Sequence, residues 1–118
     1  TWLEVTITGF ANHAGATPMD QRQDAMLAAA RFTVAVNEAV RAEPGRQVAT
    51  VGRINATPNT TNVVAGSVVL TVDLRDLDDA KVARFAARFR EIGAEIGRST
   101  STTFAFRELV TSKAALAE

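Results

Sequence analysis

The stretch Val68-Val69-Leu70-Thr71-Val72-Asp73-Leu74-Arg75 decides the fold of this chain. Its aliphatic residues recur at every second position, which predicts a β-strand because successive strand side chains point to opposite faces of a sheet. One face carries Val68, Leu70, Val72 and Leu74, and the other carries Val69, Thr71, Asp73 and Arg75. If helices cover the aliphatic face, Asp73 and Arg75 lie on the open face, where a rigid strand holds the guanidinium away from the core.

The segments on either side of this strand alternate between strand and helix patterns. The expected elements are a strand from the first residues through residue 8, a helix over residues 21–41, a strand over residues 47–55, a helix capped by Asp78 or Asp79 that runs through residue 97, and a strand over residues 102–110. The tail over residues 112–118 is expected either to fray or to begin a helix. The order βαββαβ predicts an α+β, ferredoxin-like sandwich, with a four-stranded antiparallel sheet and two helices on one face.

Apolar residues at helical spacing predict which helix faces enter the core. The first helix offers Ala25, Ala28, Ala29, Phe32, Val36 and Val40, and the second offers Val82, Phe85, Phe89, Ile92 and Ile96. In the last strand, Phe104 and Phe106 are expected to share one face. In the strand over residues 47–55, regular alternation places Val48, Thr50 and Ile54 on one face and Ala49, Val51 and Arg53 on the other.

The composition fits one folded domain of modest size. The chain has 118 residues, 47% of them hydrophobic, with 13 basic residues, 13 acidic residues and no cysteine. The zero net charge argues against a nucleic-acid or anionic-membrane partner, since clustered positive charge usually meets both. The lack of cysteine excludes disulfides, thiolate catalysis and cysteine-based zinc sites. No apolar run approaches the roughly 20 residues of a membrane span, and no signal peptide pattern is visible, so we expect a cytoplasmic protein.

Two loops carry the residues that can do chemistry. The first, Gly9-Phe10-Ala11-Asn12-His13-Ala14-Gly15-Ala16-Thr17-Pro18-Met19, holds the only histidine of the chain among neighbours too small to bury it. The second is Pro58-Asn59-Thr60-Thr61-Asn62-Val63-Val64-Ala65-Gly66. With Arg75 they offer an imidazole, several amides and a guanidinium, which can bind an anion or a polarised carbonyl but cannot complete a hydrolysis alone. One histidine without ligand spacing predicts no metal site within this domain.

Each of these residues also has a purely structural interpretation. His13 can be a solvated loop residue without function. Arg75 can pair on the surface with Asp73, Asp76 or Asp78, instead of clamping a substrate carboxylate. Asn59 and Asn62 can both be turn formers, or either amide can hold a carboxylate or ureido group. The residues themselves leave these alternatives open.

The motifs together resemble the lid, or dimerisation, domain of the M20 metallopeptidase superfamily. The branch that they resemble most is that of N-carbamoyl-L-amino acid hydrolases and allantoate amidohydrolases. The resemblance rests on the first loop followed by Arg22, Asp24 and Ala25, on Pro58-Asn59-Thr60-Thr61-Asn62-Val63-Val64, and on Thr71-Val72-Asp73-Leu74-Arg75-Asp76. Ala65 departs from the proline that this branch usually has before the glycine, which loosens the turn but removes no functional group.

The resemblance implies that residues 1–118 are a single lid domain from a larger two-domain hydrolase and are inactive alone. The two divalent metal ions of such an enzyme (Zn, Mn, Co or Ni) would lie in the absent domain, and this domain would bind none. The implied partners are the parent's own catalytic domain, a second copy of the lid and a small ureido or carbamoyl acid. The family pairs its lids through an edge strand and adjoining helix, and the strand over residues 47–55 is expected at a sheet edge, where unpaired backbone invites such pairing.

Residue by residue, the resemblance implies three roles, all delivered to the active site of the other subunit. His13 would stabilise the tetrahedral oxyanion, Asn62 would bind substrate, and Arg75 would hold the substrate carboxylate. Two other hypotheses compete with this one. The chain could be a free-standing ferredoxin-like module that senses an amino acid through Arg75, or a structural dimerisation unit in which His13 is idle.

Overall fold

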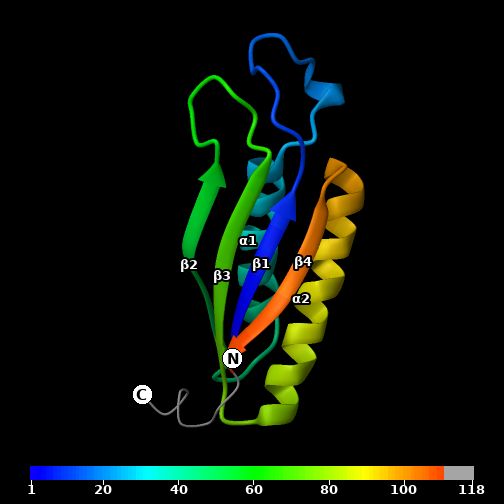
Figure 1. Cartoon of the computed structure of the whole chain (residues 1–118). Helices are drawn as coiled ribbons and strands as arrows, with labels where there is room; N and C mark the ends of the chain where they lie inside the picture. The colour runs from blue at the N-terminus through cyan, green and yellow to red at the C-terminus, as the bar shows by residue number, and fades with distance from the viewer. Residues whose placement is uncertain (111–118) are drawn as a thin grey trace.

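The computed structural model describes residues 1–110, which form a sheet with two helices packed on one of its faces (Figure 1). The elements are β1 (Trp2–Thr8), η1 (Met19–Gln21), α1 (Ala25–Arg41), β2 (Val48–Thr57), β3 (Ser67–Arg75), α2 (Asp79–Thr100) and β4 (Thr103–Val110). All strand pairs are antiparallel and the strand order is β2-β3-β1-β4. This confirms the predicted α+β, ferredoxin-like fold and puts β2 at an edge. The prediction for residues 112–118 lies outside the described residues.

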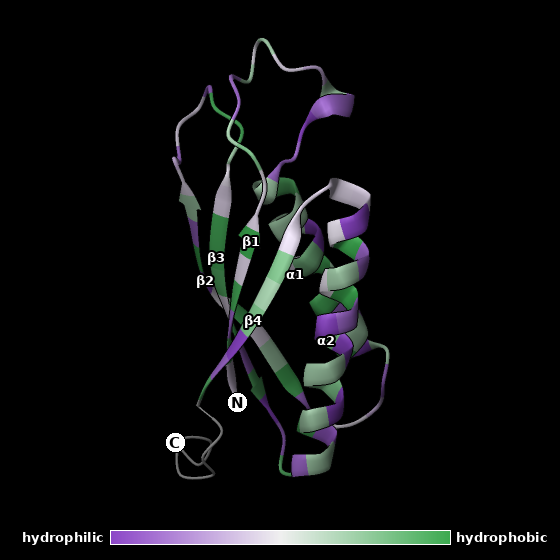
Figure 2. Cartoon of the chain, turned by 45° about the vertical axis from the view of Figure 1, so that its right-hand side comes forward, coloured by the Kyte–Doolittle hydropathy of each residue, from purple (hydrophilic) through white to green (hydrophobic). Residues whose placement is uncertain are grey.

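The core lies between the sheet and the helices, as the aliphatic face of β3 predicted. Val68, Leu70, Val72 and Leu74 are fully buried, beside Leu3, Val5 and Ile7 of β1. All six predicted apolar residues of α1 are buried, and Figure 2 shows hydrophobic residues, in green, recurring along the helices that lie against the sheet. Phe104 and Phe106 share the helix-facing side of β4, and their ring centroids lie 5.5 and 5.8 Å from that of Phe32. Burial of these apolar surfaces is the main force that holds the two layers together.

The predicted faces of β2 are wrong in its second half. The register against β3 shifts between Val51 and Arg53, so one extra residue interrupts the alternation. Beyond this bulge Ile54 pairs with the buried Leu70, and Arg53 pairs with Thr71 of the open face. The two residues have therefore exchanged the faces that regular alternation gives them, as a β-bulge requires.

The helix boundaries also differ from the predicted ones, for reasons of hydrogen bonding and close packing. The helix α1 begins at Ala25, not at residue 21, because the Asp24 carboxylate caps it by accepting from the amides of Met26 and Leu27. The cap of α2 is Asp78, one of the two residues expected there. The helix continues past Gly97 to Thr100 and is capped by Ser101, whose backbone is left-handed with φ 56°. A Cβ at Gly97 would lie 2.7 Å from the Thr102 carbonyl oxygen. That glycine therefore permits close packing of β4 and does not stop the helix.

Candidate functional site

The two loops that carry the candidate residues lie side by side at one end of the sheet (Figure 1). His13 and Val63 form an isolated antiparallel bridge between them. The Ala14 amide donates to the Asn62 carbonyl at 2.8 Å, and the Val64 amide donates to the Asn12 carbonyl at 2.8 Å. The structure thus brings the backbones of His13 and Asn62 together, and both residues are exposed.

A close approach between backbone segments fixes the base of the first loop, where residue 9 meets residue 23 just before α1. The Gly9 amide donates to the Gly66 carbonyl at 2.8 Å, and the Phe10 amide donates to the Gln23 carbonyl at 2.9 Å. A Cβ at Gly9 would lie 2.1 Å from the Gln23 carbonyl oxygen, so no other residue fits there without a shift of the backbone. The loop is therefore anchored to the end of β1 and to the start of α1.

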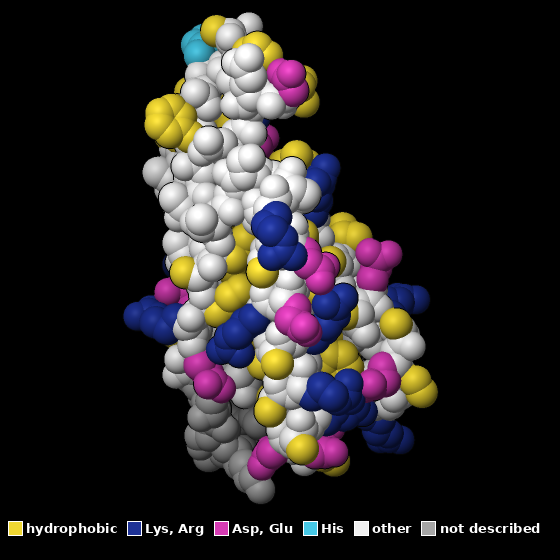
Figure 3. Space-filling model, turned by 90° about the vertical axis from the view of Figure 1, so that its right-hand side faces the viewer, with side chains coloured by type: hydrophobic (Ala, Val, Ile, Leu, Met, Phe, Trp, Pro, Cys, Tyr) yellow, Lys and Arg dark blue, Asp and Glu magenta, His cyan; other side chains and the backbone are white. Residues whose placement is uncertain are grey.

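The His13 side chain lies at the tip of the molecule, where Figure 3 shows it in cyan. The Gly15 amide donates to its Nδ1 at 3.1 Å. Because Nδ1 accepts this bond, we assign the proton of the neutral ring to Nε2. The ring can then donate a hydrogen bond from Nε2 to an acceptor outside this domain, which suits a carbonyl oxygen that gains negative charge.

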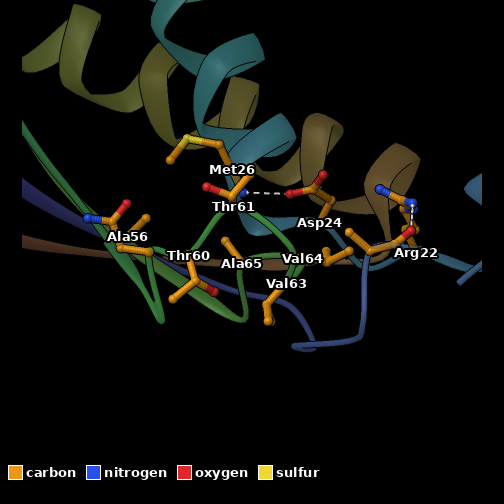
Figure 4. Close-up of a pocket in the computed structure, with 11 residues that line it drawn as sticks. Arg22, Asp24, Met26, Ala56, Thr60, Thr61, Val63, Val64 and Ala65 are labelled. Carbon is orange, nitrogen blue, oxygen red and sulfur yellow. Dashed lines mark hydrogen bonds between the residues drawn. The ribbon is translucent and has the colours of Figure 1, made fainter. Parts of the chain in front are cut away.

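Arg22 is the residue of this site for which sequence reasoning gave no role. Its Nη2 donates to the Ala14 carbonyl at 2.7 Å, a bond drawn in Figure 4, and its Nε donates to the Thr17 carbonyl at 3.2 Å. The only sequence signal was its place in the resembling motif, just before the first helix. A pattern of residue types cannot reveal a side chain whose partners are backbone carbonyls.

An open hollow of about 240 Å³ is lined by residues from both loops and from the first turn of α1 (Figure 4). Its lining mixes apolar side chains with an arginine, a carboxylate, hydroxyls and the Asn59 amide; it comprises Ala14, Arg22, Asp24, Met26, Ala56, Asn59, Thr60, Thr61, Val63, Val64 and Ala65. Asn59 has a φ of 58°, a left-handed turn conformation that asparagine tolerates. The Asp24 carboxylate is already engaged in capping α1. The Arg22 guanidinium is likewise engaged with backbone carbonyls, so the polar groups left for a ligand are the threonine hydroxyls and the Asn59 amide, beside apolar side chains.

Arg75 lies on the open face at the other end of β3. Its guanidinium donates to Asp73 through Nε at 2.9 and 3.2 Å and through Nη2 at 2.9 Å. Asp73 was one of the three predicted surface partners of Arg75. The carboxylate of Asp76, another of the three, lies 3.8 Å from the Lys81 ammonium. Both members of the Asp73 pair are about one-third exposed, so the pair itself adds little stability.

Arg75 is not brought near His13. At about 3.3 Å per residue, the nine residues of β3 separate its two ends by roughly 26 Å. The 49 Å long axis of the domain is consistent with this separation. The candidate residues therefore form two sites, a loop end with His13 and Asn62 and a strand end with Arg75.

The described part of the chain offers no metal site and no membrane span. Within residues 1–110, no three His, Cys, Asp or Glu side chains lie close enough together to hold a metal ion. No helix in the same range has the length and apolar character needed to cross a membrane.

Comparison with known proteins finds one family across most of the chain. Residues 1–101 match the family described as "Peptidase dimerisation domain". The N-carbamoyl-L-amino-acid amidohydrolase of Rhizobium meliloti is 47% identical over 88 residues, which are 74% of this chain and 21% of that protein. The allantoate amidohydrolase of Escherichia coli (strain K12) is 38% identical over 81 residues, 69% of this chain and 20% of that protein.

Solved structures agree with these relatives. A hydantoinase/carbamoylase family amidase from Burkholderia ambifaria superimposes with a TM-score of 0.91 at 35% identity, over 94% of this chain and 27% of that one. A "putative amidohydrolase/peptidase" from Burkholderia cenocepacia gives a TM-score of 0.89 at 38% identity, over 93% of this chain and 27% of that one. The chain spans about a fifth of the length of the curated relatives it matches.

Proposed function

Because this chain belongs to the peptidase dimerisation domain family, we propose that it is the lid and dimerisation domain of a larger, cytoplasmic amidohydrolase. The parent enzyme would cleave a carbamoyl or ureido C–N bond in a small acid, such as an N-carbamoyl-L-amino acid or allantoate. The relatives bearing those names support this substrate class. The domain itself would supply binding and charge stabilisation, and would be inactive alone.

The separation of the two ends of β3 carries the proposal further. A small ureido acid is about as long as two or three residues of extended chain, roughly 10 Å. It cannot touch the loop end and the strand end of one lid, which lie roughly 26 Å apart. If His13, Asn62 and Arg75 all contact one substrate molecule, two lids must contribute. We therefore propose that His13 and Asn62 come from one subunit and Arg75 from the other.

The chemistry of each group fits its proposed part. The Nε2–H of His13 would donate to the amide carbonyl oxygen as it becomes an oxyanion, and loss of one such donor typically costs about 10²–10³ in rate. The Asn62 amide both donates and accepts, so it can hold a ureido group. The planar guanidinium of Arg75 suits a carboxylate, with Asp73 fixing its orientation from the same strand.

The edge strand β2 supports self-association. Val48 and Ile54 are 54% and 47% exposed on this edge, although both are large aliphatic residues. An exposed edge with apolar side chains favours pairing with another strand. We propose that two lids pair through β2 and the adjoining α1, which would join the two subunits into a homodimer.

The metal ions implied by the family would have to be held outside the described residues, since residues 1–110 offer no group of ligands for one. The role of this domain is then to bind the substrate and to stabilise the negative charge that develops on it.

Mixed dimers of the full-length enzyme test the shared site. One subunit carries His13→Ala and the other Arg75→Ala, and at substrate concentrations well below KM each homodimer should keep at most about a tenth of the wild-type rate. With the roles split between subunits, the heterodimer has one intact site and regains about half of the wild-type rate, as expected for a two-fold dimer with two equivalent sites. If one lid supplied all three residues to a single site, both sites of this heterodimer would be defective and no activity would return.

The matched control places both substitutions in one subunit and pairs it with a wild-type subunit. The split arrangement predicts no activity in this heterodimer, whereas a single contributing lid predicts about half of the wild-type rate. If the His13→Ala and Arg75→Ala homodimers both kept full activity, the domain would be a structural dimerisation unit only.

A further inference from the structure

We propose that Arg22 is a positioning residue that holds the His13 imidazole in the orientation needed to meet the substrate. The inference rests on the proposed function for the direction of its kinetic effect. Its geometric part, that the arginine fixes the ring, stands on contacts within this chain. Arg22 would touch neither substrate nor metal, and would act only through the backbone of the loop.

The contacts form a short chain from Arg22 to the ring. The guanidinium donates to the carbonyls of Ala14 and Thr17, the residues that follow His13 by one and four positions. The Thr17 hydroxyl and amide donate to the His13 carbonyl at 2.8 and 3.1 Å. The Gly15 amide, inside the same turn, donates to Nδ1 of the ring. The bonds to the ring and to the His13 carbonyl therefore lie within the turn that Arg22 closes, while the bridge to Val63 holds the His13 backbone from the second loop.

The backbone around Arg22 is held in place by its neighbours, so the Arg22 side chain can in turn hold the first loop. Its side chain is half-buried, and its backbone is extended with φ −85° and ψ 142°. The next residue, Gln23, accepts the Phe10 amide at 2.9 Å, and Asp24 caps α1. A group mounted on such a base can hold a catalytic side chain within the narrow limits that transition-state contacts require.

The chemistry of the contact requires an arginine. A guanidinium offers several N–H donors in a planar fork, so it can reach two carbonyls from one side chain. A lysine at this position would keep the charge but act as a single point of contact. Without the guanidinium, the carbonyls of Ala14 and Thr17 would accept hydrogen bonds from water instead, and the turn over residues 13–17 would become less ordered. Misplacing a reacting group by about 1 Å can cost 10²-fold in rate.

The first test measures the ring directly. His13 is the only histidine of the 118 residues, so the imidazole nitrogen signals of this chain in a ¹⁵N-labelled NMR sample are unambiguous. In the wild-type chain Nε2 should give the signal of a protonated nitrogen and Nδ1 that of an acceptor. Arg22→Ala should shift both towards the averaged values of an unstructured peptide and reduce the amide order parameters of residues 13–17. Added guanidinium ion should reverse part of this change.

Matched variants separate this effect from general damage. Arg31→Ala makes the same change of charge on the exposed side of α1, where the guanidinium donates to the Ser99 hydroxyl, and should leave the ring signals unchanged. Arg22→Lys should give the intermediate result expected of a single contact. If the His13 signals and loop order parameters of Arg22→Ala match the wild type while the sheet amides stay native, Arg22 does not position the ring and the inference is overturned.

The second test uses kinetics of the full-length enzyme. Arg22→Ala should lower kcat by up to about 10²-fold, with little change in KM and no change in the shape of the pH profile. In a His13→Ala background the same substitution should cost nothing more, because its effect passes through the ring. An equal loss in both backgrounds would overturn the inference. If His13→Ala alone left kcat unchanged, the proposed function would fail, and the NMR result would still decide whether Arg22 holds the ring.

Discussion

His13 and Val63 pair as an isolated antiparallel bridge, 50 positions apart in sequence, and this pair joins the two loops that carry the candidate chemistry. Two backbone hydrogen bonds flank it, from Ala14 to Asn62 and from Val64 to Asn12. The bridge is what makes one site of two loops. The Gly9–Gly66 bond joins the same loops at their base, and the bridge holds them together further out, where the imidazole and the Asn62 amide lie.

Substitution of His13 should separate donor chemistry from loop structure. His13→Ala in the full-length enzyme should lower kcat by about 10²–10³-fold, because one oxyanion donor is lost. His13→Gln keeps an N–H donor of similar reach and should lose less. Steady-state kinetics and far-ultraviolet circular dichroism check the two effects. Equal activity of wild type and His13→Ala would show that the ring is idle.

Arg75 should matter most for substrates that carry a carboxylate. Arg75→Ala removes a charged hydrogen-bond donor, worth about 10–10² in apparent affinity, so KM should rise by that factor. A substrate analogue with a neutral amide in place of the carboxylate provides the comparison. The wild-type enzyme should discriminate between the two and the variant should not. If the variant still favours the carboxylate by the wild-type ratio, Arg75 is not the clamp.

A charge on the pairing edge should break the dimer. Ile54→Lys puts an ammonium on the exposed edge strand β2, where lysine blocks edge-to-edge pairing. Light scattering across a range of concentrations should then find a monomer where the parent enzyme is a dimer. Thr103→Lys makes a comparable change on β4, the opposite edge, and should leave the dimer intact. The reverse result would assign the interface to β4.

Two glycines should respond very differently to alanine. Gly9→Ala forces a Cβ to within 2.1 Å of the Gln23 carbonyl oxygen, so we expect a loss of about 1–3 kcal/mol in the free energy of unfolding. Gly52→Ala meets nothing within 4 Å in this chain and should change that free energy by no more than about 0.5 kcal/mol. Urea denaturation of both variants measures the difference. Similar losses would show that the approach at Gly9 relaxes freely.

Acidification should weaken the contact between α2 and the segment that follows α1. The Arg84 guanidinium donates to Glu43 at 2.8 Å and holds the pKa of that carboxyl below its usual value. A carboxyl with a lowered pKa in the folded state stabilises the fold above its unfolded-state pKa, and the contribution is lost as pH falls through the folded-state pKa. Between neutral and acidic pH, the melting temperature should therefore fall less for Glu43→Gln than for the wild type. Parallel falls would show that the pair contributes nothing.

Much of this fold could be predicted from local sequence patterns. The alternation in β3 and the helical stripes each record which side of an element is apolar, and that property depends only on neighbouring residues. The alternation in β2 did not predict the bulge between Val51 and Arg53, because the bulge is defined by how β2 pairs with the distant strand β3. Nor could a local pattern show that Gly97 accommodates a neighbouring strand, since the carbonyl it admits belongs to Thr102 in the returning chain.

The candidate residues divide in the same way. The sequence by itself determined which groups were available, since His13, Asn62 and Arg75 are recognisable from residue type and motif. Only the tertiary structure decided how they are grouped. It joined the two loops through the His13–Val63 bridge, put Arg22 on the carbonyls of the same turn, and left Arg75 a strand's length away. Those relations follow from chain reversal and strand pairing between distant residues, which no local pattern records.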